Sequence, residues 1–129
     1  MPPTEMMIME LQERIDGDAL VATVLESRLD ASSAPALKKR MAALIKDGHH
    51  RLALDLSAVE FIDSSGLSAM VSALRQLHGD GDLVLIAPRN TVLSMFKLTR
   101  LDRVFRIFPD QMQALAALAA PIIQCAPDR

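Results

Sequence analysis

The segment from Leu52 to Leu77 constrains the fold more than any other part of this sequence. From Leu52 to Ser57, leucine alternates with smaller or polar residues, which is the period of a pleated strand. The later part predicts a helix with one apolar stripe, formed by Leu67, Met70, Val71, Leu74 and Leu77. Between the two lies Asp63-Ser64-Ser65-Gly66. A strand-to-helix junction offers free backbone N–H groups and a partial positive charge, so we expect the chemistry of the protein here.

An antiparallel hairpin is expected at the start of the chain. Met6 to Ile15 and Ala19 to Leu25 both have the character of strands, and Asp16-Gly17 stands between them. A two-residue turn between such strands needs positive φ, which glycine adopts without steric cost.

Helices and strands alternate after the hairpin. A first helix is expected to begin after Ser33, with Pro35 in its first turn, and to stop at Gly48. The elements predicted beyond the serine junction are a strand at Asp82 to Ala87, a helix capped by Asn90 or Thr91, a strand at Asp102 to Phe108, and a helix capped by Asp110.

This alternation predicts the fold class. Strands joined through helices form right-handed crossovers, so the sequence predicts an α/β fold with a mixed, mostly parallel sheet of about five strands, an opening antiparallel hairpin and about four helices. We expect one domain over residues 6–120 and a flexible tail over residues 121–129. The carboxyl ends of parallel strands meet at one edge of a sheet, so Leu29-Asp30 and the Asp63 to Gly66 loop are expected to converge.

Composition excludes several classes of function. The net charge is −2, and four Phe with no Trp or Tyr leave neither a basic face nor stacking platforms for nucleic acid. The single cysteine, Cys125, rules out an internal disulfide and fits a reducing compartment. Neither a signal peptide nor a membrane span is visible, so we expect a cytoplasmic protein that binds neither nucleic acid nor membrane.

The three histidines do not predict a metal site. His49 and His50 are neighbours on a strand, where adjacent side chains point to opposite faces, and His78 suits the end of a helix. We therefore expect no metal and no cofactor.

Ser64 and Ser65 have four possible roles. Capping the helix is the commonest role at such a junction. A catalytic nucleophile is disfavoured because no glycine precedes either serine by two residues and no histidine is placed to serve as its base. A phosphate-binding loop is disfavoured because the segment has no lysine and Asp63 repels anions. Phosphorylation of a serine would add up to about two negative charges and weaken the binding of a partner without breaking the fold.

At this junction the sequence resembles a known family. The segment LDLSAVEFIDSSGLSAMVSAL is similar to the phosphorylation motif of STAS domains, in particular of the bacterial anti-sigma-factor antagonists. SRLDASSAPALKK resembles the second-strand exit and first helix of that family, and APRNTVLSMFKLTRLDRVFRIFP resembles its fourth strand, third helix and last strand. The resemblance extends from Met7 to Leu118.

The resemblance implies regulation by partner switching rather than an enzyme. In this family an unphosphorylated antagonist binds an anti-sigma factor, which is a serine kinase of the ATPase fold, and thereby frees a sigma factor. The kinase phosphorylates the second serine of the motif, which ends the complex, and a metal-dependent serine phosphatase restores it. For this chain the resemblance implies that Ser65 is the phosphoacceptor and that Ser64 is a lesser candidate.

The same resemblance implies which residues meet the partner. Asp30 and Asp63 would be acidic neighbours that shape recognition, Gly66 would permit close approach of the kinase, and Ser64, Ser65 and Ser68 would complete the surface. Glycine is frequent in the family at the positions of Ser27, Ser68 and Arg100, and the last two departures bear on which partner fits.

Two other classes of function remain open. The first is a scaffold or regulatory subunit of a transport or signalling complex that keeps the fold without phosphorylation; relatives of that kind often lack the intact Asp-Ser-Ser-Gly that this chain retains. The second is a small-nucleotide binder or hydrolase that uses the crevice at the strand ends. Binding of GTP or ATP at an affinity unaffected by Ser65→Ala would favour it.

Overall fold

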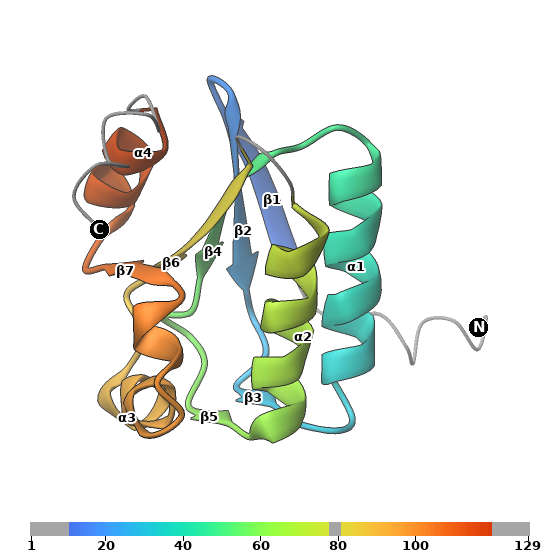
Figure 1. The fold of residues 1–129 in the computed structure, drawn as a ribbon. Helices are drawn as coiled ribbons and strands as arrows, with labels where there is room; N and C mark the ends of the chain where they lie inside the picture. Colours follow the sequence, from blue (N-terminus) through green and yellow to red (C-terminus); the bar gives the residue numbers. More distant parts are fainter. Residues whose placement is uncertain (1–10, 78–80, 120–129) are drawn as a thin grey trace.

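A five-stranded sheet forms the centre of the structure (Figure 1). The computed structural model describes residues 11–77 and 81–119. The strands of this sheet are β1 (Leu11–Asp16), β2 (Ala19–Val24), β4 (Arg51–Asp55), β6 (Asp82–Ile86) and β7 (Arg106–Phe108). They lie side by side in the order β1-β2-β4-β6-β7, with β1 antiparallel to β2 and all other neighbours parallel. The predicted mixed, mostly parallel sheet with an opening hairpin is confirmed.

The turn of the hairpin lies one residue later than predicted. Asp16 pairs with Ala19, so the two turn residues are Gly17 and Asp18 rather than Asp16 and Gly17. Gly17 has a φ of 61°. Glycine at positive φ in the first turn position matches the twist of the two strands. Residues 6–10 of the predicted first strand lie outside the described residues.

Four helices surround the sheet, as predicted. They are α1 (Ala34–Lys46), α2 (Ser64–Gln76), α3 (Asn90–Leu98) and α4 (Gln111–Ala119). Asp110 accepts a hydrogen bond from the Gln113 N–H at the start of α4, as expected. Ser33 holds the expected N-cap position of α1, but its side chain makes no cap hydrogen bond and its hydroxyl donates instead to the Arg28 carbonyl. Across the described part of the chain, every helix is too short or too polar to cross a membrane.

Helices cover both faces of the sheet, with α1 and α2 on one face and α4 on the other (Figure 1). Successive residues of β4 point to opposite faces, so Leu52 and Leu54 enter the core beneath α1 and α2 while Ala53 enters the core beneath α4. Burial of one such leucine stabilises the fold by about 1.5–3 kcal/mol. The strand that leads to the serine junction is therefore held from both sides.

Two short strands were not predicted. β3 (Arg28–Leu29) and β5 (Phe61–Ile62) form a separate parallel sheet of two strands. A two-residue strand is too short to display an alternating pattern, so only contacts between distant segments create it.

The connection between α3 and β7 also differs from the prediction. The strand expected at Asp102 to Phe108 covers only Arg106–Phe108, and Leu101–Arg103 form the 3-10 turn η2 instead. Arg100, which precedes η2, has a φ of 63°. This left-handed conformation costs a residue with a side chain about 1–2 kcal/mol, and it prevents the chain from continuing as helix or strand.

The prediction that Asn90 or Thr91 caps α3 is wrong. Arg89 holds the N-cap position and makes no side-chain cap bond. The hydroxyl of Thr91 instead donates to the Glu60 carbonyl at 2.9 Å. Thr91 thus joins α3 to the loop before β5 rather than capping the helix.

The buried face of α2 is broader than predicted. Leu67 and Met70 are buried as expected, but Ala69 and Ala73 are buried as well, whereas Val71 lies at the margin of the core. Alanine is a weak signal in a hydrophobic pattern, yet its small side chain allows α1 to pack closely against α2.

An ion pair connects the edge strand β1 to α1. Arg40 donates from Nε to Glu13 Oε2 at 2.5 Å and from Nη2 to Oε1 at 2.7 Å. The hydrogen bond from Arg40 lowers the pKa of Glu13 below its ordinary value. Arg40 is exposed on α1 and reaches across to the sheet.

We expect Arg40→Met to lower the free energy of unfolding by about 0.2–1 kcal/mol near neutral pH, the range of exposed ion pairs. Because the folded state lowers the pKa of Glu13, the stabilisation is present above the ordinary glutamate pKa of about 4.3 and is lost as pH falls through the folded value. Urea unfolding near neutral pH and near pH ~2.5 measures both effects. Lys39→Met, on the same helix without the ion pair, is the control, and an undiminished difference at the lower pH would contradict the assignment.

Candidate functional site

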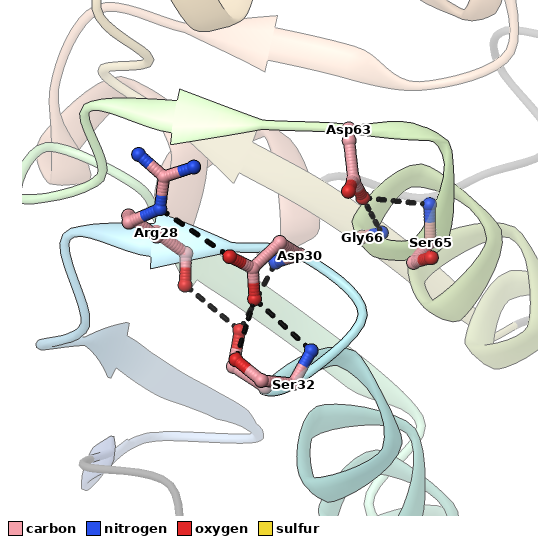
Figure 2. A network of polar contacts seen from close by, with 7 residues as sticks. Arg28, Asp30, Ser32, Asp63, Ser65 and Gly66 are labelled. Atoms are coloured by element: carbon pink, nitrogen blue, oxygen red, sulfur yellow. Dashed lines mark hydrogen bonds and ion pairs between the residues drawn. The ribbon is translucent and has the colours of Figure 1, made fainter.

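The serine junction is capped by Asp63 and not by a serine. Asp63 holds the N-cap position of α2, and its Oδ1 accepts from the Ser65 N–H at 2.8 Å and the Gly66 N–H at 3.3 Å (Figure 2). The Asp63 carbonyl accepts from the Leu67 N–H at 3.1 Å. A carboxylate in this position stabilises the helix by about 0.5–2 kcal/mol. The capping role considered for the serines therefore belongs to their acidic neighbour.

The hydroxyl groups of the two serines take no part in this cap. Ser64 is exposed and Ser65 is half-buried at the first two positions of α2. Ser65 contributes its backbone N–H to the cap, whereas its Oγ has no hydrogen-bond partner within residues 11–77 and 81–119. Ser68, one turn further along, is exposed. Ser65 therefore combines a fixed backbone with a hydroxyl that the helix does not need.

Gly66 is required by a close approach inside the domain. It is buried, and a Cβ added to it would lie 2.7 Å from the Leu29 carbonyl oxygen and 2.8 Å from Cγ1 of Ile62. Real Cβ atoms do not come so near to backbone atoms, so only glycine fits without movement. The structure thus gives this glycine a packing role within the chain, separate from the approach of a kinase that the family resemblance implies.

The two loops predicted to converge do lie side by side (Figure 2). Leu29 pairs with Ile62 through the β3–β5 sheet, and the Asp63 N–H donates to the Leu29 carbonyl at 3.1 Å. The guanidinium of Arg28 lies 4.3 Å from the ring centre of Phe61, which adds a cation–π contact on the outer side of the same pair of strands. The second sheet, rather than the edge of the main sheet, creates this convergence.

Asp30 organises the loop that leads from β3 into α1. Its Oδ1 accepts from the Ser32 hydroxyl at 2.7 Å and the Ser32 N–H at 3.1 Å, and its Oδ2 accepts from Arg28 Nε at 3.3 Å (Figure 2). The hydrogen bonds from Ser32, with a smaller contribution from Arg28, lower the pKa of Asp30. Asp30 therefore remains ionised at neutral pH and is fixed within its own loop.

A surface groove of about 260 Å³ lies between the starts of α1 and α2, and we call it the serine groove. Its lining is Ala31, Ala34, Pro35, Lys38, Ser65, Ser68 and Ala69. Two predicted site residues, Ser65 and Ser68, thus meet in one hollow. Asp30, Asp63, Ser64 and Gly66 lie in the adjoining loops and in the first turn of α2 without lining it.

Lys38 and Arg28 were not among the predicted site residues. Lys38 is exposed on α1, and it lines the serine groove. A signal for it exists in the sequence: it follows Ala34 by four residues, which places both on adjoining parts of one helix face. Arg28 gives no such signal, because its contact with Phe61 depends on the unpredicted sheet.

The described residues offer no acid–base or metal-binding constellation at this site. Among residues 11–77 and 81–119, no three His, Cys, Asp or Glu side chains gather as metal ligands. His49 and His50 precede β4, whereas the serine junction follows it, so these histidines lie at the opposite end of the sheet from Ser65. His78 and Cys125 lie outside the described residues.

Sequence comparison gives one family over most of the chain. A sequence model of STAS domains matches residues 8–114. BtrV of Bordetella bronchiseptica, a protein named for a role as anti-sigma factor antagonist, is 27% identical over 106 residues, which cover 81% of this chain and 90% of that protein. The anti-sigma-F factor antagonist RsfB of Mycobacterium tuberculosis is 25% identical over 103 residues, which cover 80% of this chain and 84% of that protein.

Comparison with solved structures agrees with the family match from sequence. The crystal structure of an anti-sigma factor antagonist from Mycobacterium paratuberculosis superimposes with a TM-score of 0.80 at 28% identity, and the match covers 87% of this chain and 95% of that one.

We expect Gly66→Ala to lower the free energy of unfolding by about 1–3 kcal/mol, because the new methyl group collides with the backbone of β3. Helix propensity alone predicts the opposite sign, a gain of about 1 kcal/mol. Urea unfolding measures the free energy of unfolding and so distinguishes the loss expected from the collision from the gain expected from helix propensity. Ser68→Ala, at an exposed position of the same helix, is the control and should change stability by less than about 0.5 kcal/mol. A Gly66→Ala variant as stable as wild type would show that the close approach is not needed.

Proposed function

The chain belongs to the STAS domain family, and we propose that it is an anti-sigma-factor antagonist that acts by partner switching. In this proposal the unphosphorylated chain binds an anti-sigma factor that is also a serine kinase of the ATPase fold, and a sigma factor is released. Phosphorylation of Ser65 ends the complex, and a metal-dependent serine phosphatase restores the binding form. The chain itself is a binding protein and carries out no reaction.

One observation supports this proposal above the others: the Ser65 hydroxyl is partly accessible while the backbone around it is fixed. Asp63 caps α2 through backbone N–H groups, and no described residue bonds to Ser65 Oγ. A kinase can therefore modify Ser65 in the folded chain without disturbing the start of the helix. A serine whose hydroxyl capped the helix would have to give up that bond first.

Charge explains how the modification would end binding. A phosphate adds about 1.5–2 negative charges, and the carboxylate of Asp63 caps the same turn. A partner that covers this surface must remove water from the phosphate and from the carboxylate beside it, and burying such charge without a countercharge costs several kcal/mol. Asp30 and Asp63 would shape recognition from the adjoining loops, and Ser64 and Ser68 would form the rim of the contact surface.

The serine groove gives little support to a nucleotide pocket. Its volume of about 260 Å³ is below the range of about 300–1,000 Å³ usual for small-molecule sites, and Lys38 is the only cationic residue in its lining. Gly66, the single glycine of the junction, is used for packing against β3 and does not leave backbone N–H groups open toward the groove.

We expect Ser65→Asp to weaken binding to the kinase that co-purifies with the protein by about 100-fold or more, since burying an unpaired carboxylate in the interface costs several kcal/mol. Ser65→Ala should bind as well as wild type, because Ser65 Oγ holds no structural bond. Titration calorimetry with the purified kinase measures both affinities. Equal binding by the two variants would count against the switch.

We also expect Ser65→Ala to abolish incorporation of labelled phosphate by that kinase and Ser64→Ala to leave it largely intact. The two serines are adjacent on one helix turn, so each variant is the matched control for the other. Mass spectrometry of the modified peptide identifies the acceptor. Phosphate incorporated into the Ser65→Ala variant at the wild-type rate would move the assignment to Ser64 or to another residue.

A further inference from the structure

A phosphate on Ser65 is negatively charged and is stabilised by nearby N–H donors or cations. The described structure limits which of these groups are available. The N–H groups of Ser65 and Gly66 at the start of α2 already point to the carboxylate of Asp63. Replacing that carboxylate by the phosphate would break the cap of the helix.

The start of α1, on the other side of the serine groove, offers no replacement. The Ala34 N–H donates to the Asp30 carbonyl at 2.8 Å, and the Ala36 and Leu37 N–H groups donate to the Ser33 carbonyl. Pro35 has no N–H group. These N–H groups are therefore already committed to holding the start of α1.

The charged side chains of the adjoining loops do not serve either. Asp30 and Asp63 are carboxylates and repel an anion. Arg28 is paired with Asp30 and lies over the ring of Phe61, so it is held on the outer side of the β3–β5 sheet.

Lys38 is the remaining cation, and it lines the same groove as Ser65. Within residues 11–77 and 81–119 it forms no ion pair and no side-chain hydrogen bond. Its long, flexible stem can move the ammonium group across a hollow of this size at little cost.

Building on the phosphorylation of Ser65 proposed above, we propose that Lys38 is the positioning residue for that phosphate and draws it into the serine groove. The phosphate then fills part of the hollow between α1 and α2 as well as changing its charge. A partner that inserts a side chain into this hollow is excluded by occupancy in addition to repulsion.

A chain with phosphoserine incorporated at position 65 during translation tests this without any kinase. Titration of the phosphate by ³¹P NMR at low salt gives its second pKa, which is ordinarily about 6. A nearby ammonium favours the doubly charged form, so we expect the pKa to rise by about 0.5 unit in the Lys38→Met variant relative to the wild-type background. Lys38→Arg should keep the wild-type value, and added salt should reduce the difference.

Lys39→Met is the matched control, since Lys39 is the adjacent cation on α1 and does not line the groove. It should leave the phosphate pKa unchanged. Equal pKa values in the wild-type background and in Lys38→Met would overturn the proposal, and so would an equal shift in Lys39→Met, which would indicate general surface charge. A kinase that never modifies Ser65 would overturn the proposed function instead and would leave this measurement unaffected.

Discussion

The close contact between Gly66 and the backbone of Leu29 is the constraint on which the site depends. It presses the first turn of α2 against β3, and the hydrogen bond from the Asp63 N–H to the Leu29 carbonyl continues the same contact. Because β3 leads directly into α1, the starts of both helices are fixed relative to each other. Ser65 from one helix and Lys38 from the other can therefore line one groove with a stable shape.

The large elements could be predicted because each is long enough to show its own periodicity. The hairpin, the central strand and the four helices follow from alternating or helical spacing. The adjacency of the two acidic loops could be expected from strand order, although the β3–β5 sheet is what creates it. β3 and β5 could not be predicted, since two residues carry no period and their pairing depends on contacts across the chain. The groove was beyond prediction for the same reason, and so was the bend at Arg100, where a residue other than glycine adopts a left-handed conformation.

The carboxylates of the site serve structure before they serve recognition. Asp63 caps α2, and Asp30 closes the loop before α1, where hydrogen bonds from Ser32 lower its pKa. Both side chains are held by several donors and cannot turn away from an added negative charge. Any anion at the start of α2 therefore meets carboxylates that are fixed in position, which in the proposed function would make a single phosphate on Ser65 effective.

The absence of a structural bond at Ser65 Oγ, within the described part of the chain, has a consequence for how a regulated form of this protein responds. Because modification of this hydroxyl breaks no described hydrogen bond of the fold, the domain can keep its structure in both forms, and in the proposed switch the proportion of the two forms is set by the enzymes that add and remove the phosphate. In that proposal the domain responds to the balance of those two enzyme activities and not to a change in its own fold.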